Sequence, residues 1–403
     1  PTVNNYFGNG PGGRYDIRLV GGFPAGARAL SLSQAAQMGV HLRAIEALVA
    51  SLYDVPPGTD AHRGVHQRVL EACTDFSADV ALTGRHARFS AAVGELSYES
   101  GLSVEARLGA VGELVRLADE WLADVSVSEG ACHREAQDIV SALCAYVSTP
   151  FPLASRAELY GEVPPNLDQQ ETLQFHRDKK ALTEESRVRV RILEEIHTRV
   201  RWKPAGGATK KKESQQVAAG EITPGPWSGF YFEFFDSASF SSAEFFFPVD
   251  FSGSYWGEGL YCPGAFFAQS VTFSNSFYGG NVSFIGTHCQ GIADFSGCTY
   301  AANADFGVTR YMSPVTFSEC IYRGEANFNE NQYGERADFS GSTFGKEAVF
   351  ADSVYSTKTV FSYSVFSAAT DFSNIVLAGS SPSFKKCVFA VGKKPARREF
   401  KRA

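Results

Sequence analysis

The stretch that decides the fold reads ADFSGCTYAANADFGVTRYMSPVTFSECIYRGEANFNENQYGERADFSGSTFGKEAVF, residues 293–350. Phe recurs in it at every eleventh position, and the same step extends to both sides. The thirteen positions are Phe240, Phe251, Cys262, Phe273, Phe284, Phe295, Phe306, Phe317, Phe328, Phe339, Phe350, Phe361 and Phe372. A second large residue follows five residues later in nearly every case; these are Phe245, Trp256, Phe267, Tyr278, Cys289, Tyr300, Tyr311, Tyr322, Tyr333, Phe344, Tyr355, Phe366 and Leu377. One extra residue shifts the last copy to Phe384 and Phe389.

Small or branched residues precede each large residue by two positions, for example Ala337 before Phe339 and Ser342 before Phe344. In an extended segment, residues i and i−2 point to the same side, so both are expected to face inward. One such unit cannot bury its aromatic ring alone, but stacked coils about 4.8 Å apart place each ring over the one below. A helical coil with an eleven-residue period is excluded because Gly253, Gly297 and Pro314 fall inside the repeat. The pattern therefore predicts a β-solenoid.

The repeats Ala293–Gly297 (ADFSG), Ala326–Phe328 (ANF) and Ala337–Gly341 (ADFSG) resemble the A-[DN]-[LF]-x-x motif of pentapeptide-repeat proteins. The resemblance covers roughly residues 230–390 and implies a right-handed, four-sided β-helix. The family's usual coil holds four five-residue units, whereas here every second unit carries one extra residue. We infer a coil of two eleven-residue repeats with the extra residues at opposite corners, and a flat coil of one repeat is the alternative. The resulting rod would be about 30 Å long.

The chain changes character twice before the repeats, which predicts an α + β multidomain protein. Its expected parts are an irregular arm (1–34), an α-helical domain (35–203), a flexible polar linker (204–226), the solenoid (227–390) and a basic tail (391–403). Helices are expected near 35–53, 62–75, 84–98 and 134–147.

Two further helices are predicted in more detail. One begins at Ser103 as N-cap and buries one face; that face comprises Val104, Leu108, Val111, Val115, Ala118 and Leu122. The other runs from about Thr183 to Trp202, with Val188, Ile192, Ile196 and Val200 on one side and arginines, Arg189 among them, on the rest. The helical region resembles the one that precedes Phe-rich repeats in actinobacterial pentapeptide-repeat proteins, for which the resemblance implies no activity.

Composition excludes several classes of protein. The 403 residues carry a net charge of −7, which argues against a general nucleic-acid binder, so no direct nucleic-acid binding is expected. None of the eight cysteines has C-x-x-C or metal-ligand spacing, so they are expected to be buried thiols of a reducing compartment. The sequence contains no apolar run of roughly 18 residues and no signal segment, which favours a cytoplasmic protein without a membrane span.

The motifs that carry chemistry are weak in this sequence. His62 and His66 stand four residues apart but lack the glutamate of a zinc-protease motif, and Asp119 and Glu120 are adjacent and so point apart on a helix. The serines of the repeats have no partnered base nearby. We therefore expect no catalytic, metal or cofactor site and no enzyme; an enzyme housed in the helical domain is the third hypothesis.

The charge of the solenoid motivates the functional hypothesis. Residues 225–390 contain 15 Asp and Glu but seven Lys and Arg. With a 22-residue coil, Asp250, Asp294 and Asp338 fall on one face, which is the candidate binding face, and Asp305 and Asp371 fall on the opposite one. Asp at this position also belongs to the repeat motif, where it can bond neighbouring backbone.

The main hypothesis is a non-enzymatic scaffold for protein–protein interaction, with an unidentified protein partner. A homodimer through a solenoid end is a further expectation. The alternative is an acidic rod that imitates duplex DNA and thereby inhibits or protects a topoisomerase or another DNA-binding enzyme, as some members of the resembled family do.

Overall fold

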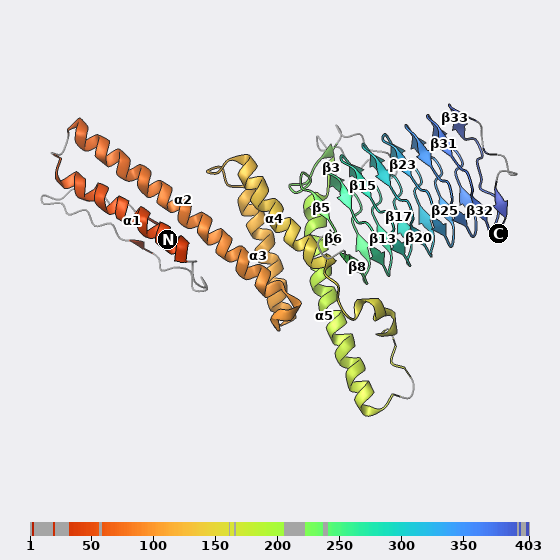
Figure 1. Ribbon diagram of the computed structural model, residues 1–403, viewed down its shortest axis with the longest axis horizontal. Coiled ribbons are helices and arrows are strands. Elements are labelled where there is room, and N and C mark those ends of the chain that lie inside the picture. Colours follow the sequence, from red (N-terminus) through yellow and green to blue (C-terminus); the bar gives the residue numbers. More distant parts are fainter. Residues whose placement is uncertain are drawn as a thin grey trace. The chain divides into compact units, whose positions relative to one another are not determined.

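The computed structural model describes residues 2–3, 19–20, 32–55, 59–160, 162–164, 167–204, 222–236, 241–392, 395 and 400–402. The chain divides into two compact units, residues 1–96 and 97–403. Helices dominate the first unit, and the second combines helices with a parallel β-solenoid (Figure 1). The predicted α + β fold, with helices before a four-sided β-helix, is confirmed.

The first unit is built from helix α1 (Leu32–Tyr53) and helix α2 (Asp60–Leu96). They pack through a cluster that includes Leu52, Val65 and Val69. Two separate helices at 62–75 and 84–98 were expected, but α2 is continuous because neither a proline nor a left-handed residue interrupts it, and Gly84 inside a helix costs only about 1 kcal/mol. Most of the predicted arm lies outside the described residues; strand β1 (Thr2–Val3) pairs with β2 (Leu19–Val20).

The helices of the second unit are α3 (Val104–Leu122), α4 (Glu129–Ser148) and α5 (Gln169–Val200), with short 3-10 turns η1 (Tyr98–Ser100) and η2 (Ala154–Tyr160). Ser103 is the N-cap of α3, as predicted. The predicted face of α3 is confirmed at Val104, Val111, Val115 and Ala118, which are buried. It is wrong at Leu122, which is exposed, and it missed the buried Leu114 and Trp121. Helix α5 begins well before Thr183. Asp168 is its N-cap and forms a capping box with Glu171 in the first turn, which sets the helix start at Gln169.

The predicted inner row of α5 is confirmed, but Arg189 was wrongly placed on the exposed side. Val188, Ile192, Ile196 and Val200 are buried, and so is the Arg189 side chain, which is 2% exposed. Its Nε donates to Glu185 Oε1 at 2.8 Å, and its two terminal nitrogens donate to the carbonyls of Val147 and Thr149 at the end of α4. Glu185 also accepts from Arg107 and Tyr146. The sequence pattern of charge could not reveal this network, because its partners come from three helices.

The solenoid has four sides, each a parallel sheet, and each coil holds 22 residues, since Tyr255 pairs with Phe277 and Phe277 with Thr299. The first side comprises β9 (Val249–Asp250), β13 (Val271–Thr272), β17 (Ala293–Asp294), β21 (Val315–Thr316), β25 (Ala337–Asp338) and β29 (Thr359–Val360). The second comprises β10 (Tyr255–Trp256), β14 (Phe277–Tyr278), β18 (Thr299–Tyr300), β22 (Ile321–Tyr322), β26 (Thr343–Phe344), β30 (Val365–Phe366) and β33 (Val388–Phe389).

The chain reaches the other two sides in the second half of each coil. The third side, opposite the first, comprises β5 (Phe232–Glu233), β11 (Leu260–Tyr261), β15 (Val282–Ser283), β19 (Ala304–Asp305), β23 (Ala326–Asn327), β27 (Ala348–Val349) and β31 (Thr370–Asp371). The fourth comprises β8 (Glu244–Phe245), β12 (Phe266–Phe267), β16 (His288–Cys289), β20 (Arg310–Tyr311), β24 (Gln332–Tyr333), β28 (Val354–Tyr355), β32 (Val376–Leu377) and β34 (Lys401–Arg402). A coil of two eleven-residue repeats is therefore correct.

The second residue after the first Phe of each repeat forms a left-handed corner. Positive φ angles recur there every eleven residues, at Gly253, Gly264, Asn275, Gly286, Gly297, Val308, Glu319, Glu330, Gly341, Asp352, Tyr363 and Asn374, and then at Lys386. These corners alternately follow the first and the third side. A buried hydroxyl or thiol next to the corner donates to the carbonyl of a Phe on the preceding coil, as Ser342 does to Phe317 at 2.7 Å.

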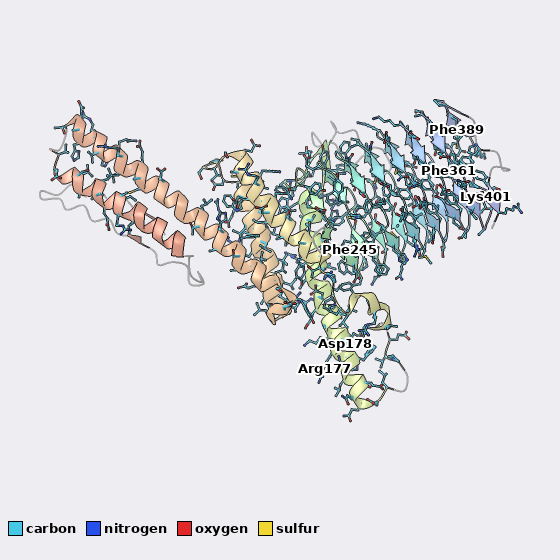
Figure 2. All side chains as sticks on the ribbon, in the orientation of Figure 1. Arg177, Asp178, Phe245, Phe361, Phe389 and Lys401 are labelled. Atoms are coloured by element: carbon cyan, nitrogen blue, oxygen red, sulfur yellow. The ribbon has the colours of Figure 1, made fainter. Side chains whose placement is uncertain are left out.

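The large side chains stack inside the solenoid, as predicted. Phe328 is fully buried between Phe306 and Phe350, with ring centroids 5.2 and 5.1 Å away and nearly parallel planes. The shifted last copy is also correct, because Phe384 stacks on Phe361 and Phe389 on Phe366. Figure 2 labels Phe245 near the first coil and Phe389 near the last.

The first copy was assigned to the wrong residue. Leu260 pairs with Phe232, so Phe234 takes the place one coil below Cys262 that the eleven-residue step gave to Phe240. The chain then leaves the coil through the hairpin of β6 (Phe235–Asp236) and β7 (Ser241–Ser242), and Phe240 itself lies outside the described residues.

Short ladders flank the predicted linker and close the predicted tail. Strand β3 (Lys203–Pro204) pairs with β4 (Ile222–Thr223), and residues 205–221 lie outside the described part. At the other end, Lys401 and Arg402 pair with Val376 and Leu377 on the fourth side, and Phe400 is buried. The chain end is thus part of the last coil.

Candidate functional site

The outward residues of the first side form one row along the solenoid. The register places Asp250, Asp294 and Asp338 in this row at alternate coils, with Thr272 and Thr316 between them. Successive carboxylates are therefore two coils, or about 10 Å, apart. Asp305 and Asp371 lie on the third side. The structure thus puts the three predicted residues on one face without bringing them into contact.

Each carboxylate in this row bonds the backbone of its own corner. Oδ1 of Asp250 accepts from the N–H of Ser252 at 2.8 Å, Asp294 from Ser296 at 2.9 Å, and Asp338 from Ser340 at 2.9 Å. Thr272 and Thr316 accept in the same way from the residue two positions later. The position therefore suits a short side chain with an acceptor oxygen, which explains Asp and Thr there without any ligand, although Val360 takes the same place on β29.

The negative charge of Asp338 is also neutralised by a neighbouring arginine. Arg336 donates to its Oδ2, and the two form an ion pair. Burial alone would raise the pKa of Asp338, but the hydrogen bonds from Ser340 and the charge of Arg336 outweigh burial and lower that pKa. The first side thus presents two uncompensated Asp carboxylates from this row, at Asp250 and Asp294.

A groove of about 460 Å³ lies on the opposite, third side, and we call it the side-3 groove. Its charged and amide lining residues are Asn281, Asn303, Asp305, Glu325, Asn327 and Glu347, and Ser283 also lines it. Asn281, Asn303, Glu325 and Glu347 are 22 residues apart and form one column, next to the column of Ser283, Asp305 and Asn327. No lysine or arginine is among the described residues that line it.

Asparagines hold the lining of the side-3 groove in place. Asn303 accepts from the N–H of Glu325 at 3.0 Å and its own N–H donates to Asn281 Oδ1 at 3.2 Å. On the neighbouring column, Asn327 Nδ2 donates to Asp305 Oδ1 at 2.9 Å. The asparagine amides therefore link adjacent coils, while Glu325 is exposed at the groove surface. Such a surface favours a ligand with several positive charges.

Sequence reasoning placed the candidate face on the first side and missed Glu325 and Glu347. The signal was present, because Asn281, Asn303, Glu325 and Glu347 repeat at the coil length of 22. The prediction considered only the carboxylates that directly precede a Phe, whereas these residues directly precede the small inward residue two positions earlier.

A second, shallow cleft of about 530 Å³ lies between α3 and α5. Its charged lining residues are Arg116, Asp119, Glu120, Arg191, Glu195 and Arg199. The guanidiniums are engaged: Arg199 bonds Asp119 and Glu195, Arg116 bonds Glu113 and Glu120, and Arg191 pairs with Glu195. Asp119 and Glu120 thus serve different ion pairs, which gives no support to a paired-carboxylate mechanism.

The metal-ligating side chains and the cysteine thiols of the described residues form no reactive site. Within the described ranges, no group of three or more His, Cys, Asp and Glu side chains could hold a metal ion. Six of the eight cysteines are buried, as predicted, whereas Cys73 and Cys387 are half-buried. Burial raises the pKa of the Cys289 thiol to about 12, so it stays protonated and unreactive. No helix in the described part of the chain is long and apolar enough to cross a membrane.

Comparison of the chain with models of protein families, with curated proteins and with solved structures found no match.

Proposed function

We propose that this chain is a non-enzymatic scaffold of the pentapeptide-repeat family, and that its side-3 groove binds a basic segment of a partner protein. The observation that carries the proposal is the accumulation of Asp305, Glu325 and Glu347 in one groove whose described lining has no basic residue. Charge complementarity of this kind steers partners and selects among them. The A-[DN]-F repeats and the 22-residue coil support the family assignment.

Basic residues neutralise the carboxylates of the side-3 groove less than those of the first side. Arg336 bonds Asp338 directly on the first side, whereas Arg323 and Lys346, which stand close in sequence to Glu325 and Glu347, do not line the side-3 groove. The alternative, a DNA mimic that acts on a topoisomerase, depends on a dense acidic row. The row of Asp250, Asp294 and Asp338 carries one carboxylate per two coils, so its support is weaker.

Three further proposals concern the domain partition, the location in the cell and a homodimer. The helices of 35–203 and the solenoid of 227–390 are proposed to be joined by an accessible linker, which brief proteolysis between about Lys203 and Gly225 would cut, although α3, α4 and α5 pack with the solenoid in one compact unit. A cytoplasmic location is supported by the six buried thiols. If the chain forms a homodimer through a solenoid end, the C-terminal end is proposed, because α4 and α5 contact the first coil.

The test uses two triple variants that remove the same charge from opposite faces. Asp305→Asn with Glu325→Gln and Glu347→Gln changes the side-3 groove, and Asp250→Asn with Asp294→Asn and Asp338→Asn changes the first side. Asn keeps the oxygen that bonds the corner N–H, as Asn327 shows with Asn329, so both variants should fold.

Binding of a lysine- and arginine-rich peptide is measured by calorimetry at low and high salt, beside a peptide of opposite charge. The groove variant should bind roughly 3- to 150-fold more weakly, since three lost exposed charge pairs are together worth about 0.6–3 kcal/mol. The first-side variant should bind like the wild type. Equal weakening in both, or no binding of the basic peptide by the wild type, contradicts the proposal; stronger loss in the first-side variant supports the DNA-mimic alternative, which a supercoiling assay with a topoisomerase would then test.

A further inference from the structure

The first coil of the solenoid ends in four strand edges that no preceding coil pairs with. Strands β9, β10, β5 and β8 are the first strands of the four sides, and among the described strands each has a neighbour on one side only. Such an edge is a template for a strand of another chain. A second copy of this chain offers coils with the same register, so it is the partner that these edges fit most directly.

Helix α4 covers the edge of the third side. The side-chain amide of Gln137 donates from Nε2 to the carbonyl of Tyr231 and accepts at Oε1 from the N–H of the same residue, both at 2.9 Å. Tyr231 directly precedes β5. One glutamine thus satisfies both backbone groups that a pairing strand would use there.

The end of helix α5 covers the first and second sides. Nε2 of His197 lies 2.8 Å from the carbonyl of Ser252, and the N–H of Trp202 donates to the carbonyl of Gly253 at 3.1 Å. Arg201 forms an antiparallel bridge with Ser254, the residue before β10. The chain that continues from α5 therefore already pairs with this edge.

The fourth side is covered by side chains of the helical region. The Arg189 guanidinium lies 5.7 Å from the ring centroid of Phe246, directly after β8, and the ring of Phe151 stacks on the same Phe246 at 6.0 Å. These residues come from α5 and from the segment after α4. All four sides of the first coil are thus met by the helical region.

One cluster, which we call the latch, ties these helices to the start of the solenoid. Asp119 of α3 accepts from Nε and Nη2 of Arg199 in α5, at 3.1 and 2.8 Å, and from Nε1 of Trp227 at 3.0 Å. The Arg199 guanidinium lies 5.0 Å from the Trp227 ring centroid, and Trp227 is fully buried. Because Asp119 joins α3, α5 and the entry to the first coil, its loss should loosen all three together.

We propose that α3, α4 and α5 form an edge cap, which keeps a second copy of this chain from pairing with the first coil. The cap covers the strand edges with groups that cannot extend the sheet: a helix side chain, a helix end and aromatic rings. Terminal repeats of solenoids need such a cover for solubility. The role is independent of the side-3 groove.

The test is Asp119→Arg in the full chain, which places two arginines side by side at the latch. Glu105→Arg is the matched control, because it makes the same charge change on α3 where the partner Arg187 and Glu105 are both largely exposed. The N–H of Gly257, directly after β10, donates to the carbonyl of Ser228, next to Trp227, at 2.7 Å. Hydrogen exchange of the Tyr231 and Gly257 amides therefore reports cap opening, and light scattering reports the molar mass.

In Asp119→Arg, these amides should exchange about tenfold faster or more, and the mass should at least double with rising concentration. The control should match the wild type. Faster exchange with an unchanged mass overturns the proposal, since the open edges would then attract no second copy. Unchanged exchange also overturns it, because Asp119 would then not hold the cap; a second variant, Gln137→Ala, checks the third-side edge independently by the Tyr231 amide.

Discussion

Replacing Phe328 by Ala tests the interior of the solenoid most severely. The Phe328 ring is fully buried and stacks between Phe306 and Phe350, and it meets Phe317 and Phe339 edge to face at 5.0 and 5.1 Å. Removing a buried Phe ring costs about 3–5 kcal/mol, and each aromatic pair adds about 0.5–1.5 kcal/mol beyond burial. We therefore expect the upper part of this range, about 5 kcal/mol, for the free energy of unfolding.

Urea unfolding followed by circular dichroism measures the loss. Gln332→Ala, on the outward and exposed face of β24, is the control and should change the free energy of unfolding by less than about 0.5 kcal/mol. Because long repeat arrays can lose cooperativity, the m-value is compared as well. Equal losses in the two variants would refute the inward register of the aromatic ladder.

Three other variants probe particular contacts. Tyr300→Phe should be neutral or stabilising by about 1 kcal/mol in urea unfolding, because the Tyr300 hydroxyl is buried without a partner and Phe344 fills the same column naturally; a clear loss would reveal an overlooked bond. Val308→Gly should raise the thermal midpoint, because Val308 is a β-branched residue at φ 58°; a lower midpoint would contradict corner strain. Since the folded pKa of Asp338 is lowered, its stabilisation is present above the unfolded pKa and is lost as the pH falls through the folded value. Asp338→Asn should therefore flatten the acid side of the stability curve, and an unchanged curve would show that Asp338 contributes no such stabilisation.

The solenoid was predictable because its information is local and repeated. Each eleven-residue unit has the same pattern of inward residues, so a wrong register for one copy would disagree with the other copies. The eleven-residue step gave the wrong residue at Phe240. The hairpin of β6 and β7 inserts extra residues before the first regular coil, so Phe234 fills the inner position instead. At a terminus, only one neighbouring coil constrains the pattern.

The helical region was less predictable because its residues are buried by partners distant in sequence. Arg189 follows the spacing of an exposed residue, yet it caps the last carbonyls of α4 and packs on Phe246. The side-3 groove was missed for a different reason. The 22-residue coil was applied to the Asp residues that directly precede a Phe, whereas Glu325 and Glu347 precede the small inward residues Ala326 and Ala348.

Carboxyl footprinting of the complex with the basic peptide tests the central functional claim most directly. Carbodiimide labelling modifies accessible carboxylates, and mass spectrometry locates the labels residue by residue. Bound peptide should reduce labelling of Asp305, Glu325 and Glu347 and leave Asp250 and Asp294 unchanged. Protection of Asp250 and Asp294 with undiminished labelling of the groove residues would contradict the account.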